Sequence, residues 1–443
     1  MSLLYESRIT LRLAVPLMIG QVSQMMMGVV DTVMVGRLGV GDLAALTFAN
    51  SLFHIPFVFG IGLLSGISVF TSNSRGSNDA AGARGSCRHG LYLATALGLV
   101  LFALSWLVSL HLDFFKQPAD VTLRAQGFFR IIMASAVPAL ISIALKNHAD
   151  ALNRPWPPFW IFLGGVLLNV ALNWVMIYGN LGCPALGFEG AAWATLISRV
   201  AIVVAMVVWL VKAKTLREWV PYRWFRAPHL PDLWHLLAIG LPASFQMICE
   251  VSAFSLAGLI MGWFGATAMA AHQIAISLAA TAFMIPLGLS MALTVRVGEA
   301  KGAGEMQRLR PIAISGWLLA ACYSVVAAVA FLAFGKWTAA LFIDAPEVIS
   351  LAASLLVIVA LFQLVDSLQV ASAAMLRGLQ DARVPALMGF ASYWLVGLPV
   401  GAGMAFGLHL EARGVWWGLA AGLFVAAVTL GPRLWKFTKS PGA

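Results

Sequence analysis

The sequence predicts an all-α integral membrane protein with twelve transmembrane helices in two pseudo-symmetric six-helix lobes. Of its 443 residues, 61% are hydrophobic and only 10% are charged, and the mean hydropathy of +0.89 lies outside the range of soluble globular proteins. Apolar runs of about 18 or more residues recur along the whole chain, and each can cross a hydrocarbon core of about 30 Å. The two halves of the chain also share a pattern of Pro and Gly.

Six apolar runs lie in the amino-terminal half. The first, from Leu11 to Val35, is too long for a signal peptide and has no small-residue cleavage motif, so we expect it to remain as a membrane helix. Short connections separate it from the next five runs. The six predicted helices are at residues 8–36, 43–74, 88–111, 122–150, 158–180 and 187–212.

The longest polar connection lies at the middle of the chain. Its sequence, KAKTLREWVPYRWFRAPHLPD, contains Trp and Tyr residues that suit a membrane interface. It predicts an amino-terminal lobe at 1–211, a cytoplasmic linker at 212–234 and a carboxy-terminal lobe at 235–443. The second lobe has six predicted helices, at 235–262, 267–300, 311–335, 346–378, 384–408 and 412–436.

The distribution of basic residues predicts the orientation of these helices. With twelve spans, 21 of the 28 Arg and Lys residues fall on one side of the membrane. Basic connections favour the cytoplasm, so both termini and the linker are expected there. An odd number of helices would scatter the pattern. The net charge of +10 is spread over short connections rather than one patch, which indicates membrane lipids rather than nucleic acid as partners.

The two halves contain an internal repeat. Adding 226 to each position in 16–76 aligns them without a gap and gives 13 identities in 61 positions. Several identities are Pro or Gly, such as Pro16 with Pro242 and Gly62 with Gly288, and these residues constrain backbone geometry. Because each half has an even number of helices, the repeats are parallel and related by an axis along the membrane normal.

Three carboxylates lie well inside predicted helices: Asp31, Glu250 and Asp366. A charged side chain at the bilayer centre costs about 3 kcal/mol, so each is a candidate for transport. Glu250 aligns with Gln24, seven residues before Asp31. Seven residues are close to two helical turns, so the two acids are expected on matching helix faces, roughly 10 Å apart in depth, facing a shared interior. A structural ion pair or an interhelical hydrogen bond is the alternative role for each.

A set of neutral polar residues follows in the amino-terminal half. Asn169 and Asn173 are four residues apart and share a helix face, and Thr195 could join them. Amide and hydroxyl oxygens beside one carboxylate suit a weakly held, dehydrated cation. Interhelical hydrogen bonding fits the same spacing equally well.

Motifs of soluble and membrane enzymes are missing from the sequence. It has no GxxxxGK[ST] phosphate loop, no HExxH and no GxSxG. We therefore expect no enzymatic activity, no cofactor and no use of ATP by that route, so an ion gradient must drive any active transport. The four cysteines are far apart and form no CxxC motif, which predicts packing rather than redox or metal roles.

Four stretches together resemble one transporter family. They are GLPASFQMICEVSAF with GATAMAAHQIA after it, VDTVMVGRLG, LLNVALNWVMIYG and LRGLQDARVP. These resemble the multidrug and toxic compound extrusion (MATE) transporters, specifically the NorM-type branch, over essentially all twelve helices. The resemblance implies two six-helix lobes around a central cavity and the export of cationic amphipathic drugs in exchange for Na⁺ or H⁺.

In the amino-terminal lobe, the resemblance implies that the family's acid is Asp31. It also implies that Asn169, Asn173 and Thr195 are polar ligands of the coupling cation. Some family members pair an aspartate with the asparagine of the fifth helix, and this chain has Asn173 in that place.

In the carboxy-terminal lobe, the resemblance implies that Glu250 and Asp366 bind the coupling proton, or Na⁺ if the protein is sodium-coupled. Together with Asp31 they are expected to bind the substrate, with Gln273 and Phe362 as further contacts. Some NorM-type members carry a tyrosine one turn before the last acid. Here Phe362 keeps an aromatic ring for a cation but offers no hydroxyl.

The sequence thus predicts a monomeric, cation-coupled multidrug antiporter of the bacterial cytoplasmic (inner) membrane. Its substrates would be cationic small molecules that compete with Na⁺ or H⁺ for the carboxylates while the lobes rock in alternating access. A lipid-linked precursor flippase of the same superfamily is the main alternative, for which more helices and a cationic cavity are expected. A channel would need a constricted ring of ligands, and an intramembrane enzyme a nucleophile with a base.

Overall fold

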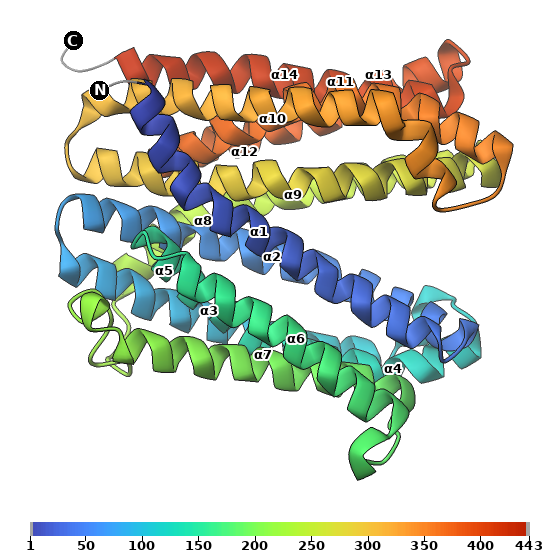
Figure 1. Cartoon of the computed structure of the whole chain (residues 1–443), viewed down its shortest axis with the longest axis horizontal. Helices are drawn as coiled ribbons and strands as arrows, with labels where there is room; N and C mark the ends of the chain where they lie inside the picture. The colour runs from blue at the N-terminus through green and yellow to red at the C-terminus, as the bar shows by residue number, and fades with distance from the viewer. Residues whose placement is uncertain (1–2, 440–443) are drawn as a thin grey trace. The chain divides into compact units, whose positions relative to one another are not determined.

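The structure is a computed structural model, and it describes residues 3–439. Within these residues every regular element is a helix, and twelve helical segments are long and apolar enough to cross a membrane. Both the predicted all-α class and the predicted number of spans are confirmed (Figure 1). Helices form along these apolar runs because lipid offers no partners to backbone N–H and C=O groups.

Seven α-helices form the first six spans. The fourth span is broken at Ser135, because Pro138 has no N–H to bond the carbonyl of Ala134 four residues earlier. Two short 3₁₀ helices, η1 Leu112–Phe115 and η2 Asn180–Gly182, lie in the connections. The helices are α1 Leu3–Gly36, α2 Val40–Gly76, α3 Ala80–Ser109, α4 Ala119–Ala134, α5 Ala136–Ala151, α6 Trp156–Tyr178 and α7 Gly187–Lys212.

A connection containing the 3₁₀ helix η3 (Lys214–Leu216) leads to the last six spans. The eleventh span, predicted as one helix at 384–408, contains two π-helical stretches. Pro399 lies between them and cannot donate the regular α-helical hydrogen bond. The elements are α8 Leu230–Gly262, α9 Ala266–Gly302, α10 Met306–Ala340, α11 Pro346–Gly378, α12 Arg383–Phe390, η4 Ala391–Gly397, α13 Leu398–Ala402, η5 Gly403–Gly407 and α14 Glu411–Lys439.

The helices form two compact units. Of the described residues, unit 1 contains 3–18 and 245–439, and unit 2 contains 19–244. This division differs from the lobe boundaries that the sequence indicated, since the connection at 212–234 packs entirely within unit 2. The chain changes units inside α1 and inside α8 rather than in a polar linker.

The two crossing points obey the internal repeat. The chain leaves unit 1 after Met18 and leaves unit 2 after Ser244, positions that are 226 residues apart. Each crossing follows a proline inside the helix by two residues, Pro16 in α1 and Pro242 in α8. The first part of α1 therefore packs with the carboxy-terminal helices, and the first part of α8 packs with the amino-terminal helices.

A buried ion cluster holds the start of α1 in unit 1. Glu6, in the first turns of α1, is completely buried and pairs with Arg296 of α9 and with Arg308 of α10, the second at 3.2 Å. The start of α1 (blue) and the end of α14 (red) lie at the same end of unit 1 (Figure 1). Buried ion pairs need good geometry to offset the cost of desolvation. Displacing the start of α1 would separate these charges, so the cluster fixes its position in unit 1.

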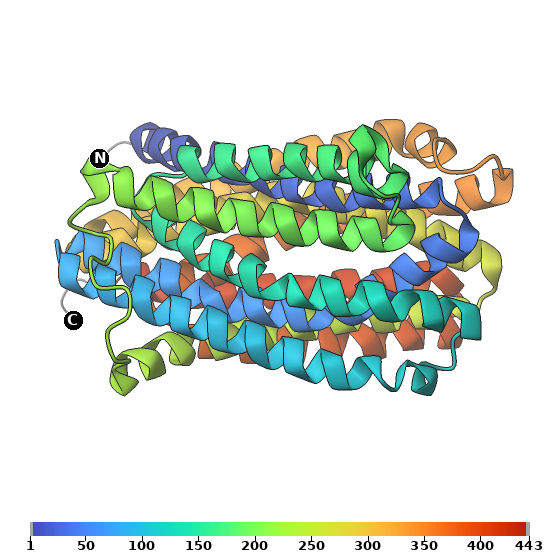
Figure 2. The ribbon, with the colours of Figure 1, turned by 90° about the horizontal axis from the view of Figure 1, so that it is seen from below.

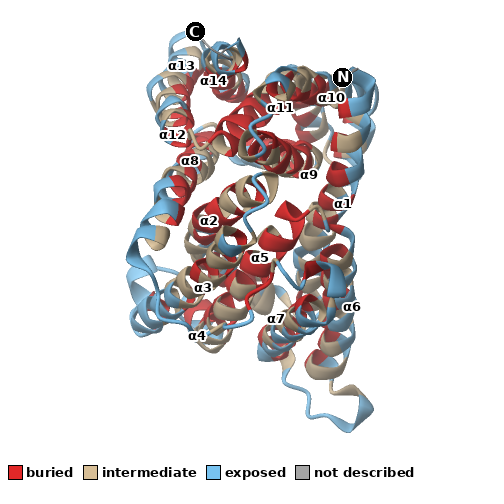
Figure 3. Cartoon of the chain, turned by 90° about the vertical axis from the view of Figure 1, so that its left-hand side faces the viewer, coloured by how far each residue is buried: buried red, intermediate tan, exposed pale blue. Residues whose placement is uncertain are grey.

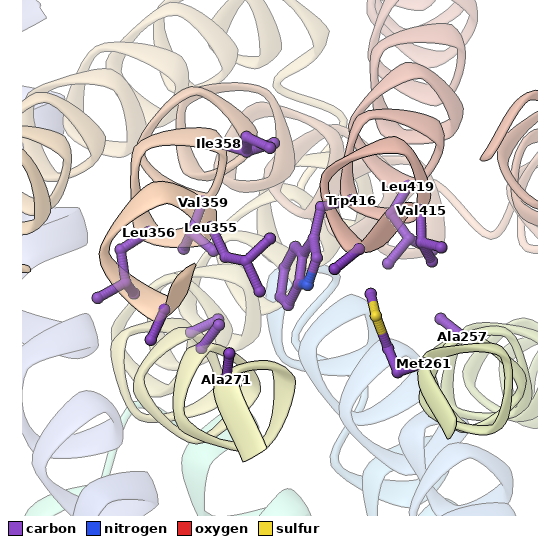
Figure 4. Packing of buried hydrophobic residues seen from close by; sticks show 14 of the residues in the cluster. Ala257, Met261, Ala271, Leu355, Leu356, Ile358, Val359, Val415, Trp416 and Leu419 are labelled. Atoms are coloured by element: carbon purple, nitrogen blue, oxygen red, sulfur yellow. The ribbon is translucent and has the colours of Figure 1, made fainter. Parts of the chain in front are cut away.

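Each unit has its own apolar core. In unit 1, the fully buried Trp416 of α14 points between α11 and α8, with Leu355 on one side and Met261 on the other (Figure 4). In unit 2, α6 and α7 run side by side (Figures 1 and 2). Buried residues gather on α9 and α11, whereas the outer sides of α3 and α6 are exposed (Figure 3). Those outer sides carry large apolar residues such as Leu99 and Trp160, as expected for surfaces that face lipid.

We call α1 and α8 the exchanged helices, because the first part of each packs with the other half of the chain. Two equivalent glycines allow these first parts to pack closely against α9 and α2, respectively. A Cβ atom added at Gly62 of α2 would lie 2.5 Å from the Cα atom of Ser244 in α8. A Cβ atom at Gly288 of α9 would lie 2.5 Å from the Cα atom of Met18 in α1. Since Gly62 and Gly288 are equivalent in the repeat, and so are Met18 and Ser244, both units use the same close contact.

We expect Gly62→Ala and Gly288→Ala each to lower the midpoint of thermal unfolding. The added methyl meets helix backbone, which cannot move aside like the end of a side chain, and such overpacking costs about 1–3 kcal/mol. Gly164→Ala in α6 is the matched control, because nothing lies within 4 Å of its added Cβ. The measurement is thermal unfolding of the protein in detergent. If all three variants unfold at the same temperature, Gly62 and Gly288 are not needed for the close packing of these helices.

Candidate functional site

A polar cluster in unit 2 surrounds Asp31 of α1. Asn173 of α6 donates a 2.6 Å hydrogen bond to Asp31 Oδ1, and Thr195 of α7 donates one of 3.4 Å to Oδ2. Asn169 completes the cluster, since its Oδ1 accepts from Asn173 at 3.2 Å and its Nδ2 donates to Thr195 Oγ1 at 3.3 Å. The structure thus brings together all four residues that the sequence singled out in the amino-terminal half.

The helix pair α6–α7 positions three members of this cluster. Asn169 and Asn173 lie one turn apart on α6 and are both completely buried. Gly190, near the start of α7, lets that helix approach the α6 backbone, because an added Cβ would be 2.7 Å from the carbonyl oxygen of Met176. This approach places Thr195 beside the two asparagines.

The cluster contains the kinds of atom that hard cations prefer as ligands. The Asp31 carboxylate, the two amide oxygens and the Thr195 hydroxyl are all oxygen ligands of the kind that hard cations prefer. One of them, Asn173 Oδ1, is buried and accepts no hydrogen bond in the structure. The single carboxylate limits the negative charge, which suits a monovalent rather than a divalent ion.

Arg199 is a component of this site that the sequence did not indicate. It lies on α7 one turn after Thr195 and interacts electrostatically with Asp31, although no ion pair within 4 Å joins them among the described residues. Its guanidinium sits 5.2 Å from the ring centroid of Phe53 and donates a 2.6 Å hydrogen bond to Ser135 Oγ. The i, i+4 spacing from Thr195 was the available signal.

Unit 1 contains a second acidic site. Asp366 of α11 is buried, Glu250 of α8 is partly exposed, and the two carboxylates are close enough to repel each other. In an interior of low dielectric constant, two neighbouring carboxylates cannot both stay negative without a compensating positive charge. The pair is therefore suited to bind a proton, Na⁺ or a cationic ligand.

Two residues beside this pair were not predicted. Arg377, in the last turn of α11, interacts electrostatically with Glu250. Tyr393, in the π-helical stretch η4, is completely buried and its hydroxyl faces Glu250, without the geometry of a standard hydrogen bond. Arg377 is eleven residues, close to three turns, after Asp366 on the same helix, which was its available signal.

Neutral polar side chains flank Asp366 along α11. Gln363 and Gln369, three residues before and after it, are completely buried, and Ser367 is buried beside it. Both side-chain polar atoms of each glutamine and the hydroxyl of Ser367 have no hydrogen-bond partner in the structure. Buried polar groups without partners cost about 1–3 kcal/mol each, so this set lowers the stability of the protein and leaves free oxygens and N–H groups near Asp366.

The structure places Phe362 and Gln273 differently from these polar groups. Phe362 is only 4% exposed, and its ring packs edge-on against Phe254 and Trp416, with ring centroids 6.0 Å apart in both pairs. Gln273 lies at an exposed position of α9 and donates a 3.4 Å hydrogen bond to Ser277. No described interaction joins Gln273 to Glu250 or Asp366.

The polar partners of each acid come from its own unit. Those of Asp31 are on α6 and α7 in unit 2, and those of Glu250 are on α11 and η4 in unit 1. The described residues contain no group of three or more His, Cys, Asp or Glu side chains placed to hold a metal ion. Any bound Na⁺ would need neutral oxygens as well as the carboxylates.

The chain matches the model of the MatE family twice, at residues 16–175 and 242–402. These segments begin 226 residues apart, as the internal repeat requires. Curated relatives include a protein named "Probable multidrug resistance protein NorM" from Agrobacterium fabrum, which is 34% identical over 95% of this chain and 92% of the relative. Another, "Multidrug resistance protein PmpM" from Pseudomonas aeruginosa, is 35% identical over 97% of this chain and 91% of the relative.

Solved structures share the same fold. An outward-facing multidrug resistance MATE family transporter of the MOP superfamily superposes with a TM-score of 0.90 at 22% identity, over 98% of this chain and 97% of that one. A eukaryotic MATE transporter, AtDTX14, gives a TM-score of 0.88 at 21% identity, over 99% of this chain and 98% of that one. The match extends over both units.

Proposed function

Because this chain belongs to the multidrug and toxic compound extrusion (MATE) family, in its NorM-type branch, we propose that it exports cationic amphipathic compounds in exchange for Na⁺ or H⁺ by alternating access. The relatives named as multidrug resistance proteins support multidrug efflux. The single observation that carries the mechanism is the pair of neighbouring carboxylates in unit 1, Glu250 and Asp366.

Competition for these two carboxylates couples the movements of ion and drug. With neither bound, the negative charges repel each other, and a proton, a Na⁺ ion or a drug cation relieves this repulsion. Asp366 is buried whereas Glu250 is partly exposed, so a bulky cation meets Glu250 first. Binding of the coupling ion then releases the drug, because the pair no longer needs a second positive charge.

The Asp31 cluster is the second coupling site in this proposal. Its carboxylate, amide and hydroxyl oxygens would hold one dehydrated monovalent cation. Arg199 also supplies positive charge near Asp31. Once the coupling cation is bound, this charge disfavours the binding of another cation at the same site. The two units would therefore contribute different binding chemistry to one transport cycle.

The exchanged helices offer a route for the conformational change. α1 carries Asp31 and α8 carries Glu250, and each of these helices has a proline next to the point where it changes units. A proline inside a helix removes one hydrogen bond and allows bending there. Movement of either helix at Pro16 or Pro242 would thus change the surroundings of its carboxylate.

The charge pattern and the family support a proposal for the location of the protein. We place it in the bacterial cytoplasmic (inner) membrane as a monomer with both termini in the cytoplasm, because the basic connections lie on the terminal side. The flippase alternative is not favoured, since the relatives are named multidrug resistance proteins and the described residues form twelve spans.

Proteoliposomes that contain the purified protein are expected to transport ethidium against its gradient when a Na⁺ or proton gradient is imposed. A tenfold ion gradient supplies about 1.4 kcal/mol, which supports about tenfold accumulation of a singly exchanged cation. Ethidium fluorescence with each gradient imposed separately identifies the coupling ion. Protein-free vesicles report the leak, and failure of both gradients to drive transport would refute the antiporter proposal.

A further inference from the structure

A strongly basic cavity lies in unit 2, and its lining includes no residue of the Asp31 cluster. It has a volume of about 190 Å³ and forms where the start of α3 meets the connection after α7. Four arginines line it, Arg84 and Arg88 from α3 and Arg223 and Arg226 from the connection, and no acidic residue does. The remaining lining residues are Ala81, Pro221 and Tyr222.

No acidic side chain among the described residues neutralises these arginines. None of the four forms an ion pair with any residue in the range 3–439. Arg84 donates a 2.6 Å hydrogen bond to the carbonyl of Glu218 and stacks over Tyr222, whereas the Nε atom of Arg88 is buried without a partner. Arg84 and Arg88 are four residues apart, where like charges destabilise a helix. An anion in the cavity would offset this repulsion.

Hydrogen bonds hold the connection in place against α3. The hydroxyl of Tyr92 lies 2.9 Å from the carbonyl oxygen of Trp224 and 2.5 Å from that of Arg226, and its single proton is shared between these two acceptors. The backbone N–H of His229 donates to His89 Nε2 at 3.0 Å. The guanidinium groups from the connection are thus carried by a backbone that is fixed to α3, so the cavity is a built feature of unit 2.

Exposed aromatic residues accompany the cavity: Tyr222 lines it, and Phe225 belongs to the same connection. Phe225 lies between two of the lining arginines in sequence and is 99% exposed, and Tyr222 is 75% exposed. Aromatic residues with apolar faces open to the outside gather at membrane–water interfaces. The charge pattern places this end of α3 on the cytoplasmic side, where anionic lipids attract basic segments. A basic cavity in a connection with exposed aromatic residues at this level suits a lipid headgroup.

We propose that this cavity binds the phosphate of an anionic phospholipid headgroup from the cytoplasmic leaflet. Arginine presents a planar fork of N–H donors that matches phosphate oxygens and binds them in pairs. Basic pockets at the cytoplasmic ends of membrane helices bind anionic lipid headgroups in the same way. The inference rests on the proposed orientation and is independent of the transport mechanism.

Lipid titration of the full-length protein in detergent tests this site. Phosphatidylglycerol should raise the midpoint of thermal unfolding, and phosphatidylcholine should not. In Arg88→Gln/Arg226→Gln, the phosphatidylglycerol concentration for half of this effect should rise about 30-fold, the loss expected for two basic contacts at a membrane surface. The control Lys214→Gln/Arg217→Gln removes two exposed charges from the same connection outside the cavity and should behave like the wild type.

Three outcomes would overturn the proposal. Equal weakening in both double variants would show a general charge effect, and equal stabilisation by the two lipids would show no headgroup selectivity. Stabilisation by inorganic phosphate as strong as that by phosphatidylglycerol would assign the cavity to a soluble anion. If the double variant does not fold, Arg226→Gln alone serves, because that side chain is exposed, and native mass spectrometry then counts retained phosphatidylglycerol. None of these measurements depends on transport activity.

Discussion

Asp366→Asn is expected to abolish gradient-driven export while the protein remains folded. The substitution keeps the size of the side chain but removes the charge that binds the coupling ion beside Glu250. Losing one partner of a buried charge interaction costs roughly 3 kcal/mol, which corresponds to about a 100-fold loss of export rate at limiting ion concentration. Stability should be unchanged or higher, because the repulsion between the two carboxylates disappears. Ethidium transport and thermal unfolding of the same preparations measure both effects.

A variant on the same helix provides the control for this prediction. Glu347→Gln removes a carboxylate from the exposed first turn of α11, far from the pair, and should export at the wild-type rate. Glu250→Gln should be as defective as Asp366→Asn, and the double variant should be no worse than either, because the two acids act as one unit. Wild-type export by both single variants would remove the carboxylate pair from the mechanism.

The sequence could predict the number of helices because the membrane permits few alternatives. An apolar run long enough to cross the bilayer must satisfy its backbone within the segment, so hydropathy and helix coincide. Where polar residues continue a helix beyond the apolar run, the prediction was short. The third helix was expected from 88 but begins at Ala80, because the carboxylate of Asp79 caps it by accepting from the N–H of Gly82 at 2.9 Å.

The division into units could not be predicted from the repeat. An alignment of the two halves shows that α1 and α8 are equivalent. The alignment would be the same whether each helix packed with its own half of the chain or with the other half. The packing of Gly62 on Ser244 and of Gly288 on Met18 decides this point, and it becomes visible only in three dimensions. The crossing inside two long apolar helices leaves no polar signal in the sequence.

The acids of the site were predictable, whereas their basic and aromatic neighbours were not. A carboxylate inside an apolar helix is costly enough to be noticed alone. Arg377 lies in the last turn of α11, where basic residues are common, whereas Arg199 lies in the middle of α7. The electrostatic contact of each arginine with an acid depends on how the helices pack. Tyr393 faces Glu250 from a π-helical stretch. A π-helix has more residues per turn than an α-helix, so an α-helical periodicity assigns Tyr393 to the wrong face.

Asp31→Asn should remove the ion dependence contributed by unit 2. The asparagine cannot provide the negative charge that Asn173 and Thr195 now surround, so the cation loses its one charged ligand. Hydrogen bonds to a charged group contribute about 1.5–3 kcal/mol, so Asn173→Ala should itself raise the ion concentration for half-maximal export by about 10- to 100-fold. The measurement is the export rate at a series of Na⁺ concentrations and pH values, and Asn180→Ala, an exposed amide bonded to the Trp174 carbonyl, is the control.

A double-mutant cycle then separates a direct ligand from a structural support. Suppose that Asn173 acts only through its hydrogen bond to the Asp31 carboxylate. Asp31→Asn/Asn173→Ala should then export no more slowly than Asp31→Asn alone, because Asp31→Asn has already removed the charged acceptor of that bond. If the two losses instead add, Asn173 supports the packing of α6 independently of the carboxylate. In that case the midpoint of thermal unfolding of Asn173→Ala would also be lower than that of the wild type. The polar cluster in unit 2 would then serve as interhelical hydrogen bonding and not as a cation site.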